Sequence, residues 1–200
     1  METMNQIALD LGVATLTLPG QEECGDRYVV VPFSDGVLVA AVDGIGHGAE
    51  AARAAEIAGN ILKSRPHEAL EPLIKRCHDE LRGTRGVVMS VASFNHPEMA
   101  LTWAGVGNVE GKLLSRDALS QPRTLLLSVG ILGHRLGPIH PTVLPIKAGD
   151  TLIFSTDGVR EDFDQHMNLN QSPQHLADDI MARSARHTDD ALVLVGRYLG

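Results

Sequence analysis

The chain has 200 residues, 44% of them hydrophobic and 21% charged. A single domain over residues 1–200 can bury a core of this size without disulfides or structural metal ions. A formal net charge of −8 excludes the broad positive field that binds a phosphate backbone, so we expect no nucleic-acid partner. Two cysteines, no basic leader and no apolar run near the ~20 residues of a spanning helix predict a cytoplasmic protein outside the membrane.

The first predicted elements are strands. Apolar residues at every second position predict a half-buried strand over residues 7–13. Two β-rich runs, 28–33 and 37–42, flank Ser34-Asp35-Gly36 and predict a hairpin.

Two helices are expected next. The alanine-rich stretch 49–63 favours a helix. Apolar residues spaced three and four apart from Leu70 to Leu81 indicate a second helix, opened by Pro66, although Pro72 leaves its start open.

The remaining pattern is mostly strands. A third helix is expected from Ser172-Pro173 to about Arg186, with the serine as N-cap. The predicted strands cover residues 87–94, 101–104, 109–114, 123–129, 142–146, 151–154 and 191–197. Long runs of strands interrupted by few helices predict an α+β fold of stacked antiparallel sheets with the helices outside.

Four aspartates stand where strands are predicted to end or begin: Asp26, Asp43, Asp157 and Asp189. Carboxylates gathered at one place repel one another unless a cation neutralises them, and all-oxygen sites suit Mg²⁺ or Mn²⁺. Any single Asp-Gly pair is more often a turn than a ligand, so the order of the four aspartates along the chain carries the interpretation.

That order resembles the PPM family of metal-dependent protein phosphatases, in the bacterial branch that includes SpoIIE and RsbU. Among its members the short chain is most similar to the stressosome feedback phosphatase RsbX, which lacks appended sensor domains. The resemblance implies a β-sandwich of two mostly antiparallel sheets flanked by helices. The motifs that carry it are Cys24-Gly25-Asp26, Asp43-Gly44 with Gly46 and Gly48, Arg85-Gly86, Val106-Gly107-Asn108-Val109, Thr156-Asp157-Gly158 and Asp189-Asp190.

The resemblance also implies site residues. Asp43 would bridge two metal ions, Mn²⁺ or Mg²⁺, and Gly44 would lend its carbonyl to one of them. Asp157 and Asp189 would complete the other position, with Asp26 close by, and water would attack phosphorus directly. Asp43, Asp157 and Asp189 are thus the predicted catalytic residues, while His47 and Asp190 are assigned minor roles.

Two departures from the family pattern concern the phosphate. Eukaryotic members hold it with an arginine shortly before the first acidic ligand, where this chain has Gln21-Glu22-Glu23. They also carry a histidine soon after Asp-Gly, whereas here the only nearby one is His47, which could equally pack against the following helix.

The implied function is dephosphorylation of serine or threonine on phosphorylated STAS-domain proteins, such as stressosome scaffold subunits, which would reset a general stress or sigma-factor pathway. Three alternatives stay open at this point. They are a phosphatase for an anti-sigma factor antagonist, a hydrolase of small phosphoesters and a catalytically silent pseudo-phosphatase that only binds its partner.

Overall fold

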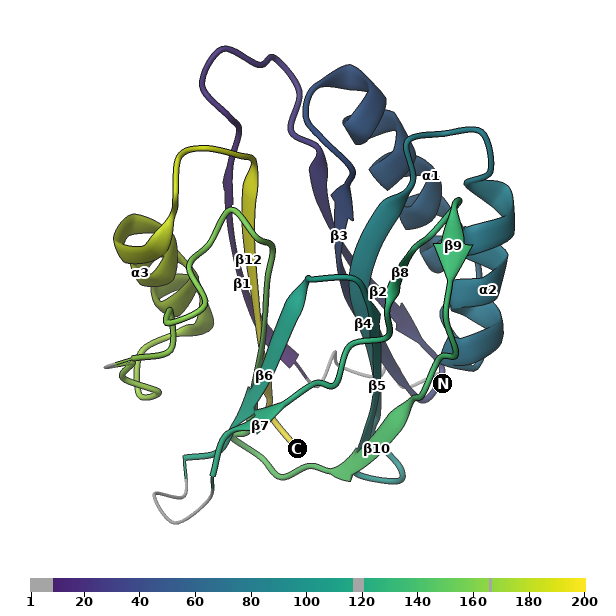
Figure 1. Cartoon of the computed structure of the whole chain (residues 1–200). Coiled ribbons are helices and arrows are strands. Elements are labelled where there is room, and N and C mark those ends of the chain that lie inside the picture. The colour runs from purple at the N-terminus through teal and green to yellow at the C-terminus, as the bar shows by residue number, and fades with distance from the viewer. Residues whose placement is uncertain (1–8, 117–120, 166) are drawn as a thin grey trace, which may run out of the picture.

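Two five-stranded sheets lie face to face in the computed structural model, which describes residues 9–116, 121–165 and 167–200 (Figure 1). In spatial order the first sheet contains β1 (Leu9–Leu16), β12 (Ala191–Tyr198), β11 (Thr151–Ser155), β6 (Glu110–Leu114) and β7 (Arg123–Thr124). The second contains β10 (Thr142–Pro145), β5 (Ala100–Val106), β4 (Val87–Asn95), β3 (Gly36–Gly44) and β2 (Asp26–Phe33). A small hairpin joins β8 (Gly130–Ile131) to β9 (Arg135–Leu136).

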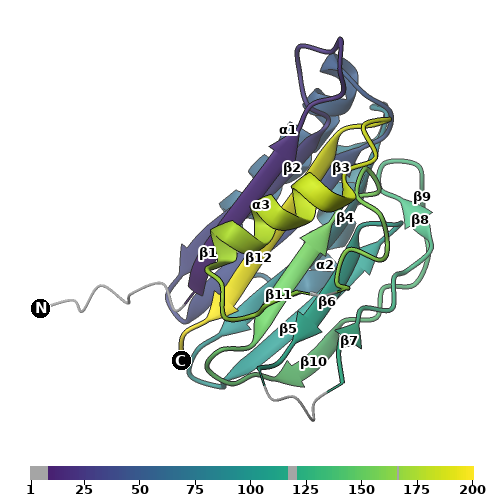
Figure 2. The same cartoon turned by 90° about the vertical axis from the view of Figure 1, so that its left-hand side faces the viewer.

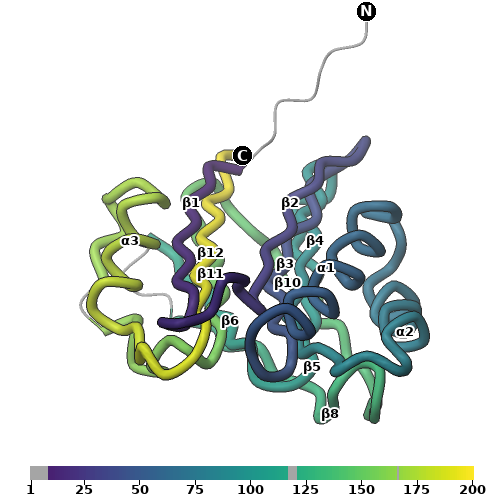
Figure 3. Tube along the Cα trace, turned by 90° about the horizontal axis from the view of Figure 1, so that it is seen from above, coloured from purple at the N-terminus to yellow at the C-terminus, as the bar shows by residue number. Residues whose placement is uncertain are grey.

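Every pairing between these strands is antiparallel, and the helices cover the outer faces. Helices α1 (Ala49–Ser64) and α2 (Leu70–Glu80) lie outside the second sheet, and α3 (Pro173–Ser184) lies outside the first (Figure 3). Figure 2 shows α3 running across the outer face of β1 and β12. The predicted α+β sandwich is confirmed.

Helix α3 begins where local chemistry predicts, whereas the expectation that Pro66 opens the second helix is wrong. The Ser172 side chain accepts a hydrogen bond from the His175 backbone N–H, and Pro173 is the first residue of α3. Helix α2 begins at Leu70, so Pro72 lies in its first turn, where the missing N–H costs no intrahelical hydrogen bond.

Apolar side chains fill the space between the sheets. Trp103 from β5 and Phe154 from β11 are almost fully buried and meet with ring centroids 5.9 Å apart. Alanines of α1, among them Ala54, Ala55 and Ala58, pack against the outer face of the second sheet. Small side chains bring the helix close to β3, the strand that carries Asp43 near its end.

Two predicted strands differ from the structure. Residues 7 and 8 of the first lie outside the described residues, and the strand continues to Leu16. The strand expected over 123–129 is wrong beyond Thr124, because Leu126 and Val129 are 82% and 84% exposed. Beyond that point the segment keeps one parallel bridge, between Ser128 and Val106.

None of the helices in the described ranges is both long enough and apolar enough to span a membrane.

Candidate active site

The predicted aspartates come together at one end of the sandwich. This is the end at which β12 begins, the upper end in Figure 1. Asp26 begins β2 and Asp43 lies near the end of β3, where the two are register partners across the pair. In the other sheet Asp157 follows β11 and Asp189 precedes β12, its antiparallel neighbour. Two strand ends from each sheet therefore bring their carboxyl groups to the same region.

Burial and mutual repulsion dominate the electrostatics of this cluster. Burial, followed by the charges of Asp26, Asp157 and Asp189, raises the pKa of Asp43 from 3.8 to about 9. Burial is also the main reason that the pKa of Asp26 rises to about 7. The same cause raises the pKa of Asp189. A group of carboxyls that resist ionisation together is the arrangement that a divalent cation relieves.

Thr156 links the two sheets at the cluster. Its hydroxyl donates to Asp26 Oδ2 over 2.7 Å and accepts from the Leu192 backbone N–H over 2.8 Å. Asn108 holds a second carboxylate of the cluster, because its Nδ2 donates to Asp157 Oδ2 over 2.9 Å. The sequence placed both residues in family motifs but assigned them no role, because their partners lie 130 and 49 positions away.

Asp190 does not point toward the other carboxyls as a free ligand. Its Oδ1 accepts from the Leu18 backbone N–H over 2.8 Å, and its Oδ2 accepts from the Gly25 backbone N–H over 2.7 Å. The side chain is 3% exposed. Asp190 therefore ties the segment before Asp26 to the start of β12, a structural role that its position beside Asp189 did not reveal.

The turn that follows Asp43 is held by backbone hydrogen bonds. Gly44 donates to the Gly25 carbonyl and Ile45 donates to the Gly86 carbonyl, each over 3.1 Å. A Cβ on Gly44 would lie 2.2 Å from the Ala51 carbonyl oxygen, so α1 can approach the turn only because this residue is glycine. His47 is exposed in the same turn. It lies near enough to Asp189 to offset part of the rise in the pKa of Asp189.

Neither cysteine offers a nucleophile. Burial raises the pKa of the Cys24 thiol to about 11 and that of Cys77 to about 12. Both thiols stay protonated at neutral pH, which argues against a cysteinyl-phosphate intermediate.

The donor set fits a hard divalent cation, because the converging groups are carboxylate oxygens around an open glycine turn. The side chains are close enough to shift one another's pKa, yet among the described residues no three His, Cys, Asp or Glu side chains already form a ligand set. Part of the reason is visible in the hydrogen bonds, since Asp26 and Asp157 are each turned toward a neutral donor.

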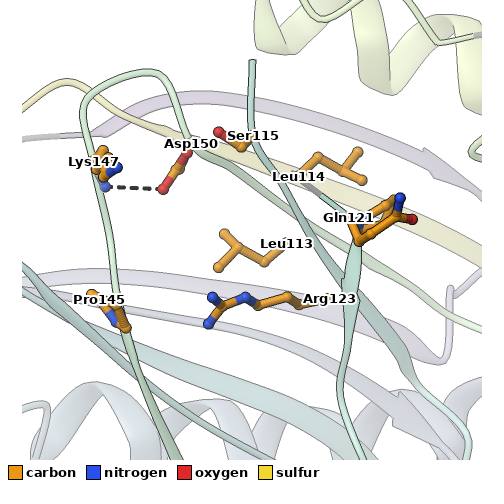
Figure 4. Close-up of a pocket in the computed structure, with 9 residues that line it drawn as sticks. Leu113, Leu114, Ser115, Gln121, Arg123, Pro145, Lys147 and Asp150 are labelled. Atoms are coloured by element: carbon orange, nitrogen blue, oxygen red, sulfur yellow. Dashed lines mark hydrogen bonds between the residues drawn. The ribbon is translucent and has the colours of Figure 1, made fainter. Parts of the chain in front are cut away.

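Two pockets lie near opposite ends of β6, and one of them adjoins the aspartates. One of about 320 Å³ adjoins the cluster and is lined by residues that include Asn108, Asp157 and Arg186. Another of about 420 Å³ lies at the opposite end of β6, where Arg123 faces Pro145 and the Lys147 backbone N–H donates to Asp150 (Figure 4). None of the four site aspartates lines this second pocket, so we assign it no part in the site.

Comparison with known proteins places this geometry among phosphatases. The model of the family described as Stage II sporulation protein E (SpoIIE) matches residues 34–198. Phosphoserine phosphatase RsbX of Bacillus subtilis (strain 168) is 22% identical over 186 residues, which are 92% of this chain and 92% of RsbX.

Solved structures agree with that comparison. A chain of the structure described as "The bacterial stressosome: a modular system that has been adapted to control secondary messenger signaling" is 32% identical, with a TM-score of 0.86 over 94% of this chain and 99% of that one. RsbX in complex with magnesium superposes with a TM-score of 0.85 at 23% identity, over 94% of each chain. The catalytic domain of the phosphatase PstP, solved with two manganese ions, shares the fold at 16% identity, with a TM-score of 0.75 over 96% of this chain and 99% of PstP.

Proposed function

Because the chain belongs to the SpoIIE family of phosphatases, we propose that it is a divalent-metal-dependent enzyme that removes phosphate from serine or threonine of phosphorylated STAS-domain proteins. The observation that carries the proposal is the convergence of Asp26, Asp43, Asp157 and Asp189 from four strand ends, with the pKa of Asp43 raised to about 9 by burial and by neighbouring carboxylates. The enzyme would act in the cytoplasm, as a single domain, on stressosome-like scaffolds.

The residues that would hold two ions, Mn²⁺ or Mg²⁺, are Asp26, Asp43, the Gly44 carbonyl, Asp157 and Asp189. Bound divalent ions supply Lewis-acid stabilisation of phosphoryl oxygens and lower the pKa of water. The RsbX and PstP structures, which hold magnesium and two manganese ions respectively, support this choice of cofactor.

The chain's own contribution is to fix the carboxylates. Thr156 and Asn108 orient Asp26 and Asp157 through single hydrogen bonds, and Asp190 holds the backbone on which Asp26 stands. Fixed donors reduce the reorganisation that the reaction would otherwise require. The exposed His47, beside Asp189, is the candidate proton donor to the leaving serine or threonine oxygen.

The identity of the substrate is tested by comparing kcat/KM on a kinase-phosphorylated STAS-domain protein, a phosphorylated anti-sigma factor antagonist and free phosphoserine. We expect the STAS-domain scaffold to be hydrolysed at least tenfold faster than free phosphoserine. Equal rates on all three would support a small-phosphoester hydrolase. Tight binding of the phosphoprotein without phosphate release, in the presence of bound metal, would support a pseudo-phosphatase.

A further inference from the structure

A pocket of about 410 Å³ lies beside the turn that follows Asp43 and contains none of the site aspartates. Its walls come from the start of α1 and from the loop between α2 and β4: Glu50, Arg53, Ala54, Gly83, Thr84 and Arg85. The charged residues of this lining are two arginines and one glutamate. This is a local excess of positive charge on a chain whose formal net charge is −8.

The loop that carries Arg85 lies at the same end of the sheet as the turn that follows Asp43. Val87 and Val88, at the start of β4, are the register partners of Gly44 and Asp43. The Thr84 hydroxyl donates to the Leu81 carbonyl and accepts from the Gly86 backbone N–H. The end of the loop that enters β4 therefore has a defined position relative to Asp43.

The Arg85 backbone and guanidinium are held separately. The Arg85 carbonyl lies 3.0 Å from His134 Nε2, within hydrogen-bond reach. Its guanidinium pairs with Glu50 and lies against Gly46, where a Cβ would be 2.8 Å from Nη1. Because Gly46 has no side chain, the Arg85 guanidinium can lie against the turn that follows Asp43.

The ion pair between Arg85 and Glu50 can be replaced by one with another carboxylate. The two side chains are 47% and 71% exposed, and ion pairs this exposed contribute little stability. Arg53, across the pocket, takes part in no ion pair within the described ranges. An incoming carboxylate can therefore replace Glu50 on Arg85 at small cost and gain Arg53 as a second partner.

We propose that this pocket binds an acidic side chain of the substrate close to its phosphorylated serine or threonine, with Arg85 as the main specificity-determining contact. The inference rests on the proposed function, because it presumes that a phosphorylated segment lies across the aspartate cluster. The carboxylates of the aspartate cluster repel an acidic segment, whereas the two arginines of this pocket attract one. Its cations therefore fix the direction in which the segment lies.

The test measures kcat/KM on p-nitrophenyl phosphate and on two phosphoserine peptides, one with aspartate and glutamate beside the phosphoserine and one with asparagine and glutamine instead. Wild type should favour the acidic peptide about fivefold, which corresponds to one half-exposed ion pair. Arg85→Gln should abolish that preference and leave the rate on p-nitrophenyl phosphate unchanged. Glu50→Gln, which removes the competing carboxylate, should increase the preference.

Arg82→Gln is the matched control, since Arg82 lies three residues away, pairs with Asp79 and does not line the pocket. Loss of activity on all three substrates in Arg85→Gln would overturn the proposal, because Arg85 would then serve the phosphoryl group itself. Equal rates of wild type on the two peptides would also overturn it.

Fluorescence anisotropy with the same two peptides separates this proposal from the proposed function. If the chain hydrolyses nothing, the phosphatase assignment fails. The pocket is still supported if wild type binds the acidic peptide more tightly and Arg85→Gln does not. Equal affinity for both peptides would contradict it.

Discussion

Asp189 and Asp190 show how far adjacent identical residues can differ in role. Asp189 is partly exposed and faces the carboxylate cluster, while Asp190 is buried and accepts two backbone N–H groups from the segment before Asp26. Both residues precede β12, and the two backbone hydrogen bonds that Asp190 accepts turn its carboxylate away from the site. The sequence pattern identified the pair, but the choice between them depends on contacts across 165 and 172 positions.

Asp190→Asn should lower the free energy of unfolding by about 2 kcal/mol, because an amide offers one oxygen where two N–H donors need acceptors. Asp189→Asn should instead keep the stability of wild type and lose phosphatase activity. Urea denaturation and phosphate release measured on both variants check this. An Asp190→Asn variant with unchanged stability and no activity would show that Asp190 acts at the metal ions.

Thr156 illustrates a residue whose importance only the fold reveals. In the sequence it is one polar residue before Asp157, whereas in the structure its hydroxyl joins Asp26 of one sheet to Leu192 of the other. The aspartates were predictable because carboxylates beside strand ends suggest a metal by their chemistry. A threonine carries no such signal by itself.

Most elements follow from periodicity and end signals, and the exceptions have physical causes. The hairpin from β2 to β3 and the N-cap of α3 are where the sequence predicts them. The segment 125–129 has the apolar content of a strand. It nevertheless leaves the sheet edge after β7, so its side chains at 126 and 129 reach solvent instead of packing against a second layer.

Helix α1 packs closely against the turn that follows Asp43, and Gly44→Ala tests the importance of that contact. The new Cβ would meet the Ala51 carbonyl at 2.2 Å, so either α1 or the turn must move. We expect a loss of about 2 kcal/mol in unfolding free energy, together with weaker metal binding measured by calorimetry.

Gly59→Ala is the control within the same helix. Its added Cβ would make only an ordinary 3.6 Å contact with Val29 and would favour the helix by up to about 1 kcal/mol. If Gly44→Ala were as stable as wild type and bound metal normally, the close approach of α1 to the turn would be unimportant.

For the whole molecule, the buried carboxyls predict how stability depends on pH. Their folded-state pKa values lie above the ordinary 3.8, at about 7 for Asp26 and about 9 for Asp43. The folded state therefore holds protons that the unfolded chain has released. Stability from this source is present at low pH and declines as pH rises from about 4 through 7 and on to 9.

Urea denaturation in a chelator at pH 5, 7 and 9 measures this decline. Asp43→Asn should flatten it between pH 7 and 9, and added Mn²⁺ or Mg²⁺ should raise the stability of wild type most at high pH, where the carboxylates are charged. A decline of the same steepness in Asp43→Asn would contradict the placement of Asp43 in the cluster.

The most direct test of the central claim is phosphate release from a phosphorylated STAS-domain protein with Mn²⁺, Mg²⁺ or chelator, by wild type, Asp43→Asn and Asp35→Asn. Asp35 is the control because it lies in the turn at the far end of the same hairpin. We predict metal-dependent release by wild type and Asp35→Asn, and a loss of at least a hundredfold in Asp43→Asn. Release that persists in chelator, or equally in Asp43→Asn, would contradict a metal-dependent phosphatase centred on these aspartates.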